Sequence, residues 1–146
     1  MRVISRQNHL TMEIQSAETR PTLRASPNYF TGTVWQEPIV DAPSPARIKG
    51  FKVKFEPGAR TAWHTHPLGQ TLYVTSGVGR IQVEGEPVRE IRQGDTVWIP
   101  PNVKHWHGAS PTQAMEHLAF QEAIDEFHAD WHEHVRDDIY AAEPQP

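Results

Sequence analysis

Three histidines and one glutamine are spaced so that they could bind a single metal ion. His64 and His66 flank Thr65, and side chains alternate between the two faces of a β-strand, so both imidazoles share one face. Gln70 follows a short turn-forming stretch, and His105 comes much later in the chain. Neutral imidazole suits Mn, Fe, Co, Ni, Cu or Zn, an amide oxygen suits the harder of these ions, and the chain has no cysteine to compete. We therefore predict a divalent metal site formed by His64, His66, Gln70 and His105.

A second group of histidines has the same two-residue period. His105 and His107 flank Trp106, so His107 shares the face of His105. His117 and Gln121 lie on one face of a later predicted strand. One interior cavity could collect all of these polar side chains.

The elements that position these residues are predicted to be short β-strands. Residues with preset turn dihedrals, mainly Gly, Pro, Asn and Asp, separate them at regular intervals. Many short strands with this punctuation are typical of a sandwich or barrel. The predicted strands cover residues 33–35, 47–55, 59–66, 70–76, 79–84, 88–91, 96–99, 105–107 and 114–121.

The chain of 146 residues fits one domain with an all-β barrel at its centre. We assign residues 1–30 to a peripheral N-terminal segment, 31–122 to the barrel, and 123–146 to a C-terminal helix and tail. A helix is predicted over 124–140, where Phe127, Trp131, Val135 and Ile139 recur every four residues. Met12 is an alternative start, which would leave Met1 to Thr11 as a flexible extension.

Composition excludes several partners. The net charge is -4 and the basic residues are scattered, so there is no electrostatic support for binding nucleic acid. No apolar run is long enough for a signal peptide or a membrane span. The absence of cysteine agrees with a reducing compartment, and we expect a cytoplasmic protein that binds neither membrane nor nucleic acid.

Four apolar side chains can be read in two ways. Phe51 and Val53 alternate with lysines, which places them on a buried face, where they either pack in the core, the reading we favour, or line a substrate pocket. Trp63 and Trp106 alternate with histidines and should face away from the cavity, as second-layer packing or as interface residues.

Two segments with bracketing glycines resemble the two motifs of the cupin superfamily. They are residues 58–77, with the pattern Gly-x5-His-x-His-x3-Gln-x6-Gly, and residues 94–105, with the pattern Gly-x5-Pro-x-Asn-x2-His. The resemblance implies a single-domain jelly-roll barrel, also described as a double-stranded β-helix, with a metal near its centre. The sequence departs from the usual pattern at Gln70, where metal-binding members carry glutamate, and at Asn102, where they carry glycine.

Residues 58–72, 104–109 and 114–122 resemble more closely the bacterial cupin-type hydroxynitrile lyases, and the likeness covers most of residues 28–135. That family cleaves or forms cyanohydrins, commonly with manganese, and assembles as tetramers. The resemblance implies a homo-oligomer, dimer or tetramer, that acts on a small molecule. Mn2+ is the expected ion, and Fe2+, Ni2+, Zn2+ and Co2+ are compatible. The resemblance also implies roles for individual residues. The metal ligands would be His64, His66, Gln70 and His105, and the catalytic histidines His117 and His107. The substrate pocket would include Phe51, Val53, Thr61 and Gln121.

The predicted activity is cleavage or formation of aromatic cyanohydrins. Three imidazoles and an amide are all neutral, so the ion would keep its full +2 charge and act as a strong Lewis acid. His117 would take the hydroxyl proton in cleavage and return it in synthesis. Alternative roles are ligand orientation for His117 and support or packing for Gln70. The rival functions are an Fe(II)-dependent dioxygenase and a non-catalytic cupin that binds a small metabolite. Phe51 stands where the family has a small residue, so the bulkier side chain would narrow the site.

Overall fold

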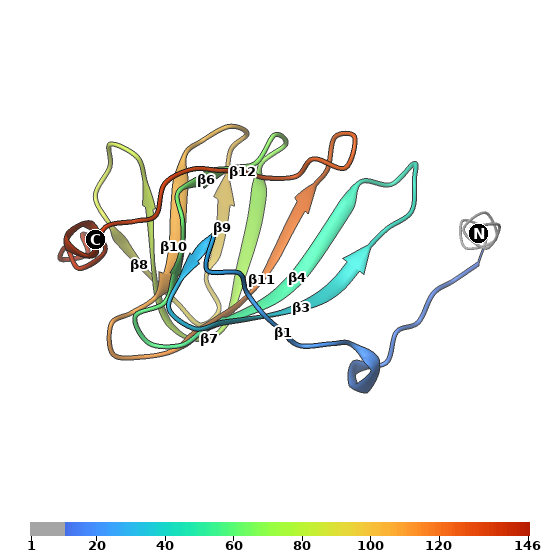
Figure 1. The fold of residues 1–146 in the computed structure, drawn as a ribbon, viewed down its shortest axis with the longest axis horizontal. Coiled ribbons are helices and arrows are strands. Elements are labelled where there is room, and N and C mark those ends of the chain that lie inside the picture. The colour runs from blue at the N-terminus through green and yellow to red at the C-terminus, as the bar shows by residue number, and fades with distance from the viewer. Residues whose placement is uncertain (1–10) are drawn as a thin grey trace.

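The computed structural model describes residues 11–146 as a strongly curled arrangement of β-strands with little helix (Figure 1). The strands form where apolar and polar residues alternate, and the turns between them are rich in Gly and Pro. The elements within the described residues are η1 (Ala17–Thr19), β1 (Leu23–Arg24), β2 (Phe30–Thr31), β3 (Val34–Asp41), β4 (Ile48–Phe55), β5 (Arg60–Thr61), β6 (His64–Thr65), β7 (Gln70–Val83), β8 (Arg89–Arg92), β9 (Thr96–Ile99), β10 (His105–Ala109), β11 (Met115–Glu122), β12 (Asp130–Trp131) and α2 (Asp137–Tyr140).

Strand β7 belongs to both halves of the barrel. Its first part pairs antiparallel with β11 and β9, and its second part, from Val78 onward, pairs antiparallel with β10 and β8. Gly77 lies between the two parts with a φ of 83°, and a Cβ there would collide with the carbonyl of Ala114. Only glycine fits this bend. Because β7 links the halves, the sheet curls around one interior, and the predicted all-β jelly-roll barrel in a single small domain is confirmed.

The barrel interior holds the main hydrophobic core. Alternate residues of the strands point inward, as the period of two requires, and nearly all of the core side chains are buried. Among them are Val34, Val53, Phe55, Leu72, Val74, Ile81 and Met115.

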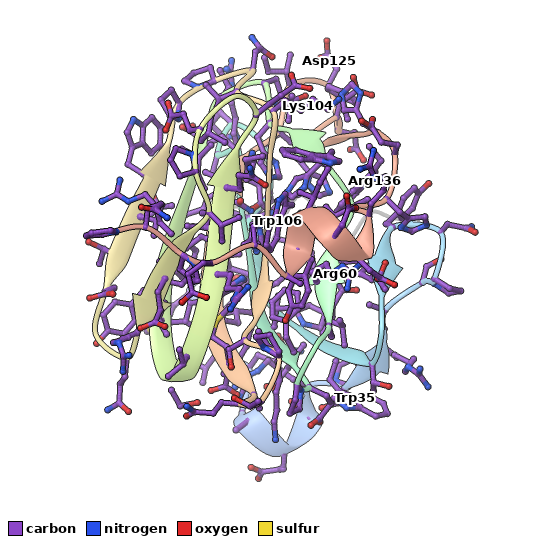
Figure 2. All side chains as sticks on the ribbon, turned by 90° about the vertical axis from the view of Figure 1, so that its left-hand side faces the viewer. Trp35, Arg60, Lys104, Trp106, Asp125 and Arg136 are labelled. Atoms are coloured by element: carbon purple, nitrogen blue, oxygen red, sulfur yellow. The ribbon has the colours of Figure 1, made fainter. Side chains whose placement is uncertain are left out.

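A second, smaller hydrophobic cluster covers the outside of the strands that carry the histidines. Trp63 and Trp106 are 6% and 0% exposed, and Trp106 packs against Tyr140 with ring centroids 5.6 Å apart. Figure 2 shows Trp106 beside the short helix α2. The structure therefore places both tryptophans in second-layer packing beneath the C-terminal segment, facing away from the cavity.

The predicted helix over residues 124–140 is wrong for most of its length. Asp125 and Glu126 have φ values of 50° and 71°, which form a tight turn rather than a helix. The chain then runs extended, and β12 pairs antiparallel with β6, with Trp131 opposite His64. Only α2 is helical, so the helix at this end of the chain is a single short turn.

The four-residue spacing that predicted the helix reflects three different environments. Phe127 is 49% exposed, Trp131 packs against the inner core, and Val135 is buried in the outer cluster. Figure 1 shows this segment crossing one end of the barrel before it reaches α2. The spacing therefore does not mark one face of a helix.

The N-terminal region contributes to the barrel from residue 23 onward. Ala25 and Phe30 belong to the inner core, and β1 pairs with β3. The predicted flexible extension lies outside the described residues except for Thr11. Over residues 11–146, no helix has the length and apolar character needed to cross a membrane.

Candidate functional site

Three predicted ligands meet because their strands are neighbours. His105 of β10 lies directly opposite His64 of β6 in the antiparallel ladder, and His66 follows two residues later. Their exposed fractions are 1% for His64, 3% for His66 and 0% for His105. One ring nitrogen from each lies within 4.8 Å of the others. The long separation in sequence is therefore closed by sheet pairing.

A tight turn brings Gln70 to the same place. The backbone N–H of Gly69 donates to the carbonyl of His66 at 3.3 Å, and Gly69 has a φ of 84°. Gln70 then opens β7, and its Nε2–H donates to Oε1 of Gln121 at 3.0 Å. This bond fixes the amide orientation, so Oε1 of Gln70 faces Nε2 of His105 at 3.4 Å.

The hydrogen bonds of the three imidazoles select one tautomer. Nδ1 of His64 lies 2.9 Å from the carbonyl oxygen of Ala62, and Nδ1 of His105 lies 2.9 Å from that of Val103. Nδ1 of His66 lies 2.6 Å from the carbonyl oxygen of residue 128. A carbonyl only accepts, so each Nδ1 carries the proton and each Nε2 keeps a lone pair.

Burial keeps these rings neutral. It lowers the pKa of His66 and of His105 to about 4 in each case, and it holds the pKa of His64 well below its ordinary value. Neutral imidazole is the form that binds a metal. The described residues thus present three Nε2 lone pairs and an amide oxygen to one another.

This donor set fits a divalent ion. Nε2 of His66 is buried and has no hydrogen-bond partner, although a buried polar group normally has one. Two donors bound to one ion at about 2.1 Å lie at most roughly 4.2 Å apart, so the 4.8 Å spread needs only a small contraction. A cation between the lone pairs would satisfy all of them together.

Two further histidines form a separate pair beside the cluster. Nε2 of His117 on β11 lies 3.0 Å from Nδ1 of His107 on β10, and among the described residues the other nitrogen of each ring has no hydrogen-bond partner. Burial lowers the pKa of His117 to about 4, and burial followed by the neighbouring His117 holds that of His107 well below its ordinary value. Two neutral rings therefore share one proton, which leaves one free nitrogen that accepts a proton and one that donates.

The cluster and the pair border one cavity with a volume of about 250 Å³. Apolar side chains line the cavity together with these polar residues, and among them are Val53 and Phe55 of β4. The predicted site residues that line it are Phe51, Val53, Thr61, His64, His66, Gln70, His107, His117 and Gln121. His105 does not line it but contacts His64, with ring centroids 4.3 Å apart. Thr61 has a second contact, since its Oγ1 accepts the backbone N–H of His107 at 3.2 Å.

Ala119, which shares its strand face with His117 and Gln121, also lines the cavity, and sequence reasoning missed six further lining residues. Phe55 shares its strand face with Phe51 and Val53, so extending the pocket assignment along that face would have found it, and Gln36 lies opposite Val53 in the ladder between β3 and β4. Phe30 lies just before residue 31, where the barrel was predicted to begin, and the remaining three lie in the segment that was predicted to be helical. The missed residues are Phe30, Gln36, Phe55, His128, Ala129 and Trp131.

The fold and the site together define a cupin. The family model described as "Cupin domain" matches residues 51–120, and the chain belongs to this family. An (R)-mandelonitrile lyase from Granulicella tundricola is 55% identical over 129 residues, which cover 88% of this chain and 98% of that protein. A close relative of this chain is therefore named as a lyase.

Solved structures agree with the fold. A cupin-like protein from Thermotoga maritima is 42% identical, with a TM-score of 0.77 over 80% of this chain and 89% of that one. The polyketide cyclase RemF from Streptomyces resistomycificus is 16% identical, with a TM-score of 0.70 over 89% of this chain and 91% of that one. At that identity the second likeness concerns the fold alone.

Proposed function

We propose that the protein is a metal-dependent hydroxynitrile lyase that cleaves (R)-mandelonitrile and related aromatic cyanohydrins to an aldehyde and hydrogen cyanide, and that also forms them. The observation that carries the proposal is the meeting of two histidine groups at one pocket, one arranged for a cation and one for a proton. The likeness to a lyase with this named substrate supports the choice of reaction.

The pocket suits a small aromatic substrate. Its volume of about 250 Å³ lies at the small end of ligand sites, which favours a molecule with a single ring. Phe30, Val53 and Phe55 offer apolar contacts for that ring. The hydroxyl and nitrile groups would then face the imidazoles and the two glutamines.

His64, His66, His105 and Gln70 would hold the divalent ion, which we propose to be Mn2+; Fe2+, Ni2+, Zn2+ and Co2+ also suit these donors. When bound, the ion supplies Lewis acidity that stabilises negative charge on a substrate oxygen or nitrogen. The four donors are neutral and leave its +2 charge undiminished. Gln121 fixes the amide of Gln70 with the oxygen toward the cluster.

His117 and His107 would move the protons. In cleavage, Nδ1 of His117 takes the hydroxyl proton, the electron pair of that bond forms the carbonyl, and the bond to the nitrile carbon breaks with its electrons on cyanide. The proton shared by the pair shifts from Nε2 of His117 to Nδ1 of His107, and Nε2 of His107 gives its own proton to cyanide. Both rings stay neutral at the end of this exchange, which their low pKa values favour. Proton exchange with water in the emptied pocket restores the first tautomer.

The test is cyanide release from (R)-mandelonitrile by protein of measured manganese content, above the spontaneous rate and under nitrogen. His64→Ala and His117→Ala should both reduce release toward the background, and His134→Ala, at an exposed histidine outside the pocket, should not. Absence of release from fully loaded wild-type protein would contradict the proposal. Oxygen uptake by iron-loaded protein would instead favour the dioxygenase.

We also propose that the protein forms a homo-oligomer. Trp98 and Tyr73 are 59% and 43% exposed and lie on the same outer face of the paired strands β9 and β7. Exposed aromatic side chains of this kind are enriched at interfaces between proteins. Light scattering should give a dimeric or tetrameric mass for the wild type and a smaller mass for Trp98→Ser; a monomeric wild type would contradict it.

A further inference from the structure

The segment of residues 127–134, which we call the strap, touches two of the three candidate ligands. It runs extended along the edge of β6 that does not pair with β10, where Trp131 lies opposite His64 and Asp130 lies opposite Thr65. The N–H of His132 also donates to the carbonyl of Trp63 at 2.8 Å. The strap is therefore a backbone neighbour of the metal cluster.

The three candidate ligands differ in what holds them. The carbonyls that accept from His64 and His105 each lie two residues away, so these rings are held within their own stretch of chain. His66 donates instead to the carbonyl of His128, which is 62 residues away and lies in the strap. The proton position and ring orientation of His66 therefore depend on a distant segment.

Trp131 makes more ring contacts than any other side chain of the strap. The ring of Trp131 lies 4.6 Å from that of His64, at an interplanar angle of 31°. Its other side meets Tyr29, with stacked rings 4.8 Å apart, and Phe30 at 5.7 Å. Upstream of Trp131 in the strap, the side chain of Phe127 is exposed and that of His128 is partly buried. Trp131 thus makes three ring contacts close to the carbonyl of His128, whereas the ring of His128 makes one.

The strap also forms part of the pocket mouth. Among the lining residues, His128, Ala129 and Trp131 are partly exposed, whereas the histidines of the cluster and the pair are buried. The ring of His128 stacks with Phe51 of β4 across a centroid distance of 6.4 Å. The same short segment therefore accepts the hydrogen bond from the candidate metal ligand His66 and forms one side of the cavity.

We propose that Trp131 is a positioning residue of the metal site: it anchors the strap so that the carbonyl of His128 fixes His66 with Nε2 toward the ion. This inference rests on the proposed metal site and identifies what keeps it assembled. Groups that orient a ligand in this way typically contribute 10- to 100-fold to metal affinity.

The first readout requires no metal. In the metal-free, full-length chain labelled with 15N-histidine, we expect downfield Nδ1–H resonances from His64, His66 and His105 by NMR, assigned with a His66→Gln variant. In Trp131→Ala the His66 resonance should be lost to exchange with water, while those of His64 and His105 remain. An unchanged His66 resonance in folded Trp131→Ala would overturn the proposal.

The second readout is affinity for Mn2+ and Zn2+, measured by competition with a chromophoric chelator. Trp131→Ala should bind roughly 10- to 100-fold more weakly. Trp131→Phe should recover most of this affinity through its ring, whereas Trp131→Leu should not. The Leu variant keeps an apolar side chain at this position but lacks the ring contacts, so it remains informative if the Ala variant does not fold.

Val135→Ala is the matched control. It removes buried volume from the same C-terminal segment, but Val135 packs in the outer cluster away from the ligands. It should lower stability and leave metal affinity unchanged; an equal loss of affinity in Val135→Ala and Trp131→Ala would reduce Trp131 to general packing. Wild-type protein that binds no divalent ion would refute the metal-dependent lyase, and the NMR comparison would still decide how His66 is held.

Discussion

The cluster and the pair contain the same side chain in the same pocket, but they differ in their hydrogen-bond partners. In the cluster, each imidazole donates from Nδ1 to a backbone carbonyl, which accepts only, so its tautomer is fixed. In the pair, His107 and His117 face each other, and an imidazole nitrogen can donate or accept. Backbone partners therefore leave one fixed lone pair on each ring, which suits the proposed cation, while an imidazole partner leaves the proton able to shift, which suits the proposed proton transfer.

Removing a member of the cluster should have the largest effect. His64→Ala deletes one of three convergent nitrogens, so we expect metal affinity to fall by more than about 100-fold, beyond the loss of an orienting group. Metal content measured by elemental analysis and cyanide release should fall together. Full metal content in this variant would show that His64 is not a ligand.

Removing a member of the pair should lower catalysis and leave metal binding unchanged. His117→Ala should lower cyanide release by about 100- to 10,000-fold, the usual range for general acid–base catalysis, with metal content unchanged. Because the two rings act as one unit, His107→Ala/His117→Ala should cost little more than either single change. Multiplicative losses in kcat would argue that the rings work independently, and a loss of bound metal would mean that the pair belongs to the cluster.

The charge of the cluster can be changed while its ligand count stays the same. Gln70→Glu replaces a neutral donor with a carboxylate, so the protein should bind the ion more tightly and stabilise substrate charge less. We expect kcat to fall about tenfold, equivalent to about 1.4 kcal/mol of transition-state stabilisation. Isothermal titration and steady-state kinetics provide the two readouts, with Gln121→Ala as a comparison that removes the hydrogen bond to the amide of Gln70 without adding charge to the cluster. A higher kcat in Gln70→Glu would refute the charge argument.

Acidification should change metal affinity least. Protons compete for the ring nitrogens only as the pH approaches each pKa, and burial lowers those of His66 and His105 to about 4. Between pH 7 and 5.5 we therefore expect less than about a threefold loss of affinity, whereas imidazoles with an ordinary pKa of about 6.5 would lose roughly tenfold each at pH 5.5. Competition titrations across this range provide the measurement, and a steep fall near pH 6.5 would contradict the effect of burial.

The barrel and most of the site could be predicted from the sequence because their signals are local. The two-residue period places His64 with His66 and His105 with His107. In the structure His64, His66 and His107 line one cavity, and His105 joins the first two in the cluster. The order of strand pairing is less local, since it depends on which edges meet. It was the resemblance to cupins that indicated how His105 reaches the first motif.

The strap could not be predicted in the same way. Its apolar residues serve an inner core and an outer cluster in turn, so their spacing imitates a helix. His128 lies outside both histidine motifs, and its contact with His66 comes from its backbone carbonyl. Every residue has such a carbonyl, so sequence contains no signal for which one will bind a particular side chain.

The alternation of residues along β10 has a consequence for how the chain folds. His105 faces the cluster and His107 lines the cavity, while Trp106 between them packs against Tyr140 on the outside. A one-residue slip of this strand would push an indole into a chamber lined with imidazoles and bury two imidazoles in an apolar layer. Burial of Trp106 in the outer cluster thereby raises the free energy of the misregistered pairing and favours the register that places the histidines at the site.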